Sequence, residues 1–225
     1  MNHGPRTFLV AVLACCVAAL GGAAQASAAC PNADTPPTAE NLPEIRAALV
    51  CLHNEARAKA RVAPLSRDGR LERAAGRHAT DMVEDGYFGH DTPSGINPFD
   101  RMRRTGYLGR GIVWNAGETI AWGSGAYATP QAVMDAWMGS TSQRLTLLAP
   151  DFRDIGIGIA LGAPVERAPN ASPAVTYTVD YGWRTTAKAL RACLRRAEGR
   201  RGRQRRVMRA KCHGLNAEPR RALAL

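Results

Sequence analysis

The sequence predicts an α+β protein that ends in a basic, helical extension. Segments with apolar residues at helical spacing come mostly before segments of alternating polarity. Helices and strands grouped in this way favour an α+β fold over a βαβ repeat. The charges divide the chain near Arg184, because residues 184–225 hold 14 basic and 2 acidic residues, whereas residues 30–183 hold 15 and 17.

Residues 1–29 predict a secretory signal peptide. Arg6 gives a positive start, residues 8–20 form an apolar run too short to span a bilayer, and small-residue cleavage sites follow at residues 24–28. We therefore expect a secreted, extracellular protein. The alternative is a lipid anchor on the cell envelope through Cys15, which ranks second because this cysteine lies inside the apolar run.

The cysteines that remain after signal removal predict disulfides. An even number of cysteines in an exported chain is typical of a disulfide framework, and four cysteines allow three pairings. Because one pair lies at each end of the chain, we predict Cys30–Cys51 and Cys193–Cys212. No C-x-x-C motif occurs, so a zinc cluster is not favoured.

Residues 30–43 form a Pro- and Thr-rich lead-in, and four helices are expected after it. Capping side chains or prolines in the first turn mark where each helix begins. The expected helices begin near Pro43, Asp68, Asn97 and Thr129, and the first three end at Pro64, Gly86 and Gly106. His78 shares a face with Leu71 and Met82, which favours a buried histidine held by hydrogen bonds over a ligand.

Short strands are expected at residues 112–114, 118–121, 155–160 and 175–181. Residues 155–160 alternate isoleucine with glycine or alanine, so one face of this strand permits very close packing. Residues 185–225 are predicted to form two helices, one on each side of a break at Gly199–Gly202, and the second disulfide is expected to close them into a hairpin. An arginine-rich disordered tail is the alternative.

Three motifs carry a family resemblance. They are Phe88-Gly89-His90, Gly117-Glu118-Thr119-Ile120-Ala121 and residues 137–144, which contain Gln143. Together the segments from Glu44 to Gly182 resemble the bacterial branch of the CAP superfamily, the SCP-like domain of cysteine-rich secretory proteins, antigen 5 and pathogenesis-related proteins. The resemblance implies a domain at residues 44–184, built as a three-layer α-β-α sandwich around an antiparallel sheet.

The resemblance also implies a groove on which histidines and glutamates converge, and where some members bind a divalent metal. His90 and Glu118 match the family pattern, whereas Gln143 stands in place of the second histidine. Thr119, Gly139 and Val179 depart from it as well. Two ligands and a carboxamide are a poor zinc site, so we expect no metal and no cofactor. His90, Glu118 and Gln143 then form a polar groove floor, or His90 and Glu118 form a structural hydrogen-bonded pair.

No catalytic residues can be assigned from the motifs. The chain has no G-x-S-x-G elbow, its thiols are expected to be oxidised, and only Glu118 among the carboxylates has a motif around it. We therefore expect a monomeric, non-catalytic binding module for lipid or another small apolar ligand. The alternative is a degenerate, peptidase-like hydrolase that uses His90 and Glu118.

The arginines of the extension predict a polyanion-binding surface. Dense guanidinium groups favour phosphate-bearing partners, here an anionic membrane surface or cell-envelope polymer. The extension has no aromatic residue, so specific nucleic-acid recognition is not expected. A nonspecific solubilising tail is the alternative. The arginines concerned are Arg200, Arg201, Arg203, Arg205 and Arg206.

Overall fold

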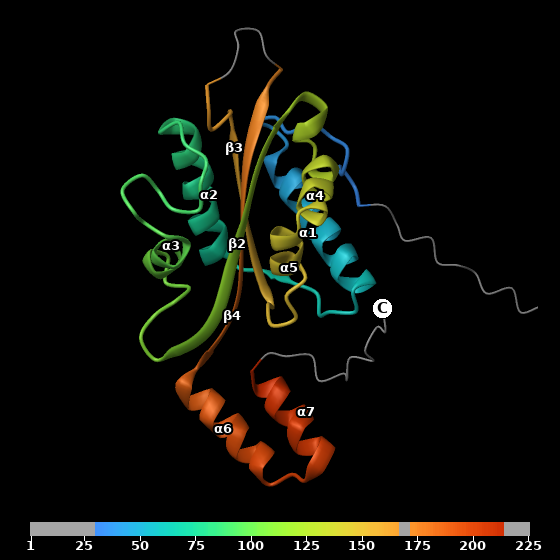
Figure 1. Cartoon of the computed structure of the whole chain (residues 1–225), viewed down its shortest axis with the longest axis vertical. Coiled ribbons are helices and arrows are strands. Elements are labelled where there is room, and N and C mark those ends of the chain that lie inside the picture. Colours follow the sequence, from blue (N-terminus) through green and yellow to red (C-terminus); the bar gives the residue numbers. More distant parts are fainter. Residues whose placement is uncertain (1–29, 167–171, 214–225) are drawn as a thin grey trace, which may run out of the picture.

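A mixed sheet runs through the centre of the computed structural model, which describes residues 30–166 and 172–213. Within these residues four strands pair in the order β1-β3-β4-β2. Figure 1 shows α2 and α3 on one face of the sheet and α1, α4 and α5 on the other. The strands are β1 (Ser66–Arg67), β2 (Ile112–Ser124), β3 (Asp154–Leu161) and β4 (Ala174–Thr186).

The expectation of a purely antiparallel sheet was wrong. The pairs β3/β4 and β4/β2 are antiparallel, but β1 runs parallel to β3, with Ser66 opposite Asp154. The chain passes through several helices and β2 between β1 and β3, and no hairpin forces these two strands into antiparallel order. The two-residue β1 also has no alternation of polarity that could have revealed it.

The segments expected as two separate strands form one long strand, β2. Gly117 lies in its middle and does not interrupt it. A Cβ at Gly117 would lie 3.0 Å from the Phe152 ring and 3.1 Å from the Thr146 methyl group, so the glycine leaves room for both side chains. Packing against these neighbours keeps the glycine in the extended conformation that it does not itself favour.

Four of the five helices that flank the sheet begin close to where the sequence predicted. The side chains of Asp68, Asn97 and Thr129 each accept a hydrogen bond from the first turn of their helix. The seven-residue α5 was not predicted, because so short a helix shows little periodicity. The helices are α1 (Leu42–Lys59), α2 (Gly69–Glu84), α3 (Pro98–Arg104), α4 (Pro130–Gly139) and α5 (Thr141–Leu147).

Helix α2 packs directly on the glycines of β3. A Cβ added at Gly156 would lie 2.2 Å from the Leu71 backbone, and one at Gly158 would lie 2.2 Å from the Ala75 backbone. The isoleucines that alternate with these glycines, Ile155, Ile157 and Ile159, point to the opposite face and are buried in the main core. The alternation of isoleucine and glycine therefore fixes the distance of α2 from the sheet, and with it the position of His78.

Arg57 of α1 is fully buried on the other face of the sheet. Its guanidinium group donates to the carbonyl oxygens of Ala63, Leu147, Ala149 and Phe152, at distances between 2.7 and 3.2 Å. The contacts with Leu147, Ala149 and Phe152 join α1 to the end of α5 and the segment after it, so this one side chain stabilises the turn there. Nothing in the sequence around Arg57 indicates this role.

After β4 the chain forms two helices, α6 (Ala187–Glu198) and α7 (Gly202–Cys212), which we call the hairpin. It extends beyond one end of the sheet (Figure 1). The predicted disulfides both form, with Cα–Cα distances of 5.7 Å for Cys30–Cys51 and 5.6 Å for Cys193–Cys212. The expected signal peptide lies outside the described residues. Among the described helices, none has the length and apolar character needed to span a bilayer.

Candidate functional site

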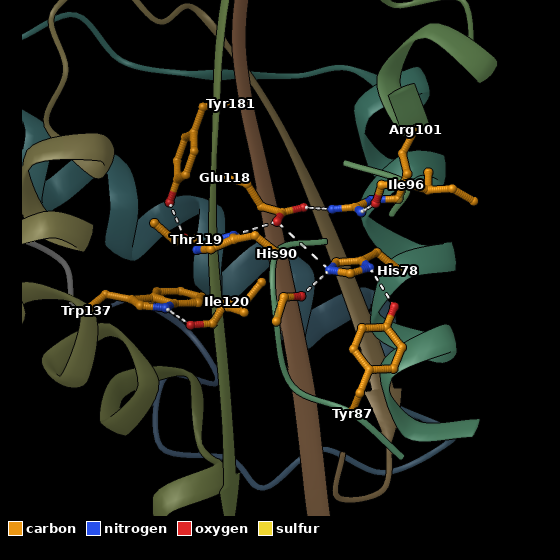
Figure 2. Close-up of polar contacts among 11 residues, drawn as sticks. His78, Tyr87, His90, Ile96, Arg101, Glu118, Thr119, Ile120, Trp137 and Tyr181 are labelled. Atoms are coloured by element: carbon orange, nitrogen blue, oxygen red, sulfur yellow. Dashed lines mark hydrogen bonds and ion pairs between the residues drawn. The ribbon is translucent and has the colours of Figure 1, made fainter. Parts of the chain in front are cut away.

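Glu118 of β2 is the centre of a buried polar cluster (Figure 2). Its side chain is 2% exposed. Arg101 donates from Nη2 to Oε2 at 2.6 Å, and Nδ1 of His90 lies 2.8 Å from Oε1. Nε2 of His78 lies 3.9 Å from the same Oε1. We refer to these four residues as the Glu118 cluster.

Each member of the Glu118 cluster is positioned by a feature of its own segment. Asn97 caps α3, which places Arg101 one turn into the helix, where its Nη1 also donates to the Ile96 carbonyl at 3.1 Å. His78 reaches Glu118 because α2 lies so close to the glycines of β3. His90 comes from the loop between α2 and α3, and its side chain is 54% exposed.

The electrostatics of the cluster favour an ionised Glu118. Burial tends to raise the pKa of Glu118, but the hydrogen bond from His90 and the charge of Arg101 outweigh burial and hold this pKa below its ordinary value. The hydrogen bond to Glu118 in turn raises the pKa of His90. The cluster is therefore an ion pair between Glu118 and Arg101 to which a readily protonated His90 is added.

His78 takes a structural part, as its helical face predicted. It is fully buried, and burial lowers its pKa. Nε2 lies 2.9 Å from the carbonyl oxygen of Gly89, and Nδ1 lies 3.3 Å from the Tyr87 hydroxyl. A neutral imidazole that donates from Nε2 and accepts at Nδ1 satisfies both contacts, so His78 ties α2 to the loop that carries His90.

Asp180 adds a second buried carboxyl group beside Glu118. It is the cross-strand partner of Glu118 on β4 and is fully buried. Neither of its carboxyl oxygens accepts a hydrogen bond from another described residue. Burial and then the charge of Glu118 raise the pKa of Asp180 well above its ordinary value, which favours the protonated form of this carboxyl group. Asp180 is not among the predicted site residues, although the alternation of β4 places it on this face.

Thr119, where the family pattern has asparagine, belongs to a separate network on the opposite face of β2. Its hydroxyl lies 3.0 Å from the Tyr181 hydroxyl, which lies 2.8 Å from Nε2 of His53. Nδ1 of His53 lies 2.7 Å from the Leu49 carbonyl, and burial lowers the pKa of His53 to about 4. This network connects α1 to the sheet and offers no reactive group to solvent.

Gln143 makes no hydrogen bond to His90 or Glu118 among the described residues. It lies on α5, which packs through Leu147 on the α1 face of the sheet. Its Oε1 is buried and has no hydrogen-bond partner among the described residues. Of the three expected groove residues the structure thus brings together His90 and Glu118, and it adds Arg101, which the sequence analysis missed. Arg101 had no motif to mark it and is one of many arginines in its segment.

The residues of the cluster do not fit a divalent metal. Both oxygens of Glu118 are already engaged, and one of them holds the permanent positive charge of Arg101 at 2.6 Å. A cation there would face electrostatic repulsion and would have to displace that ion pair. Elsewhere in the described residues, Cys30, Cys51 and Glu55 bring metal-type ligand atoms together, but the two cysteines form a disulfide.

The fold and the Glu118 cluster define a disulfide-bonded α+β domain with a polar site at an edge strand, and the disulfides are consistent with an extracytoplasmic location. Residues 50–181 match the model of the CAP family, described as the cysteine-rich secretory protein family. The chain belongs to this family.

Similar proteins include two from Bacillus subtilis. The chain is 37% identical over 110 residues to the uncharacterized protein YkwD and 31% identical over 108 residues to the uncharacterized membrane protein YlbC. These matches cover 49% and 48% of this chain but 40% and 29% of the relatives, so the chain spans less than half of their length. An outer surface protein from Borrelia burgdorferi shares the fold, with a TM-score of 0.51 and 22% identity over 63% of this chain and 94% of that one.

Proposed function

We propose that this protein is an extracellular, non-catalytic binding module whose hairpin binds the lipids of an anionic envelope surface. The five arginines predicted to bind polyanions are all exposed on the hairpin or its connecting turn. None of the ion pairs among the described residues involves a basic side chain of the hairpin. These charges are therefore available to a phosphate-bearing partner.

A shallow groove on the hairpin carries the proposal. Its lining combines the apolar side chains of Val207 and Met208 with Arg200, Gln204 and Lys211. An apolar floor with cationic groups beside it is complementary to an anionic lipid, which brings an acyl chain and a phosphate together. A phosphate polymer would use the charges but would gain nothing from Val207 and Met208.

The Glu118 cluster supports a binding role over catalysis. Glu118 and His78 have their polar atoms engaged in the interior, and Asp180 is fully buried. Nε2 of His90 has no partner among the described residues, and its side chain is half-exposed. Nucleophilic catalysis needs a nucleophile with an adjacent base, and His90 supplies at most one of these two groups.

The hairpin proposal predicts strong, salt-sensitive binding to anionic vesicles. Replacing the five arginines by glutamine should weaken binding to vesicles of roughly equal parts phosphatidylglycerol and phosphatidylcholine by about 100-fold or more, since each basic residue near such a surface contributes about 1 kcal/mol. Co-sedimentation with vesicles measures this. A matched control replaces five exposed arginines of the domain, and it should bind like the original protein. These are Arg61, Arg73, Arg77, Arg104 and Arg110.

A second variant distinguishes lipid from a soluble polymer. Val207→Ser with Met208→Ser keeps every charge of the hairpin, so it should retain binding to polyphosphate but bind the vesicles about tenfold less tightly, because apolar burial is lost. Equal binding of this variant and the original protein to the vesicles would refute a lipid site and leave only electrostatic attraction.

The alternative function, a degenerate hydrolase, is supported by the half-exposed His90 and its raised pKa. Under the binding proposal, the original protein and the His90→Ala variant should both hydrolyse peptide and ester substrates no faster than the uncatalysed background rate. The measurement is hydrolysis by the purified protein and the variant, with melting temperatures compared as the control. A turnover that disappears in a normally folded His90→Ala protein would establish the enzyme.

A further inference from the structure

The outer edge of β2 presents a row of backbone groups to solvent. Strand β2 is the last strand of the sheet, and its other edge pairs with β4 without a break from Ile112 to Ser124. Directly beyond the two ends of this ladder, Ala187 N–H donates to Gly111 O at 2.9 Å and Gly125 N–H donates to Pro173 O at 3.1 Å. Odd-numbered residues of β2 therefore direct their N–H and C=O groups toward β4.

The even-numbered residues of β2 must then direct their backbone N–H and C=O groups away from the sheet, because this direction alternates from residue to residue along an antiparallel strand. One contact supports this assignment, since Nε1 of Trp137 donates to the Ile120 carbonyl at 3.1 Å (Figure 2). For Trp114, Ala116 and Glu118 no hydrogen bond to the outward backbone groups occurs among the described residues. Three consecutive outward positions are thus available for pairing.

This edge is accessible. Trp114, Ala116 and Glu118 are all partly exposed. The side chain of Glu118 is only 2% exposed, so the exposure at this position comes from the backbone. An exposed polar backbone at a sheet edge is usually protected by lysine, proline, a bulge or a short strand. Strand β2 has 13 residues, a continuous register, and neither lysine nor proline.

We propose that the edge of β2 from Trp114 to Glu118 binds an extended peptide, which adds a strand to the sheet beside the Glu118 cluster. Main-chain hydrogen bonds to the three outward residues supply the binding energy, as in other cases of β-strand addition. The Trp137 indole occupies the next outward carbonyl and ends the pairing. His90 lies next to Glu118 through its Nδ1, and its Nε2 donates to a carbonyl group of the peptide when the ring is protonated. This binding site is separate from the hairpin and does not depend on its proposed function.

Strand addition predicts that only every second backbone amide of the bound peptide contributes a hydrogen bond to β2. Peptides about nine residues long, selected from a random displayed library on the intact secreted protein, should bind with a Kd below about 1 mM. N-methylation of the peptide amides that face β2 should weaken binding about tenfold or more each, whereas methylation of the intervening amides should have little effect. Strand addition would be refuted if methylation of consecutive amides weakened binding equally, or if methylation of no amide weakened it.

Hydrogen exchange on the protein provides the second measurement. In the free protein the amides of Ala116 and Glu118 should exchange much faster than those of Asn115 and Gly117, and peptide should slow the first pair about tenfold or more. Ala116→Pro removes one outward backbone N–H group and should abolish peptide binding. If this variant does not fold, the N-methylated peptides still test the proposal. Failure to select any peptide, or protection of the edge by dimerisation of the free protein, would overturn the proposal.

Discussion

Gly158→Val is expected to remove a large part of the free energy that stabilises the folded protein. Even the Cβ of an alanine at this position would lie 2.2 Å from the Ala75 backbone and 2.4 Å from Gly76 N, so α2 would have to move away from β3. Overpacking against backbone cannot be relieved by a side-chain rotation, and we expect a loss of roughly 4 kcal/mol or more. That is a large part of the 5–15 kcal/mol that typically stabilises a domain.

Urea denaturation of the purified variants measures this effect, with Gly139→Ala as the matched control. Gly139 is the last residue of α4, and a Cβ there has nothing within 4 Å, so the substitution should change the free energy of unfolding by less than about 1 kcal/mol. A Gly158→Ala protein that unfolded at the same urea concentration as the original would mean that α2 does not rest on the glycines of β3.

The elements that the sequence predicted well are those with local signals. Asp68, Asn97 and Thr129 each mark a helix start by a hydrogen bond within one turn, and that contact depends on nothing elsewhere in the chain. The isoleucine–glycine alternation of β3 likewise carries both its secondary structure and its close packing within one segment. The hairpin disulfide joins cysteines only 19 residues apart, so it too was predictable from position.

The parts that could not be predicted depend on register between distant segments. Asp180 lies opposite Glu118 only because β4 pairs with β2 in one particular register, and a shift by one residue would turn it to the other face. Arg101 and Arg57 were indistinguishable in sequence from the exposed arginines around them. Gln143 was assigned to the groove by motif alone, and among the described residues its side-chain oxygen makes no hydrogen bond.

Arg101→Met is expected to destabilise the protein by roughly 3–5 kcal/mol at neutral pH. Arg101 is 5% exposed and Glu118 is 2% exposed, so removing the guanidinium group leaves a buried carboxylate without its main compensating charge. Arg103→Met on the same helix is the control. Arg103 is 50% exposed and pairs with the exposed Asp100, so its loss should cost less than about 1 kcal/mol.

The pH dependence identifies the cause of that destabilisation. In the original protein the pKa of Glu118 is held below 4.5, so its contribution to stability is present above that pH and is lost as the pH falls through the lower, folded-state value. Without Arg101, only His90 and His78 oppose the effect of burial, so the pKa of Glu118 rises relative to its value in the original protein. The stability of the variant should therefore fall furthest below that of the original protein at neutral pH, where Glu118 is ionised, and the difference should be small in acid.

Combining Arg101→Met with Glu118→Gln removes both charges, so the double variant should be more stable at neutral pH than Arg101→Met alone, by about 1–3 kcal/mol. The stability that the double variant lacks relative to the original protein should also depend much less on pH, because the titrating carboxyl group of Glu118 has been removed. These comparisons come from denaturation of the original protein, both single variants and the double variant at several pH values. If the two substitutions were simply additive, the ion pair would not hold the cluster together, and the polar site would have to depend on the His78 and His90 contacts instead.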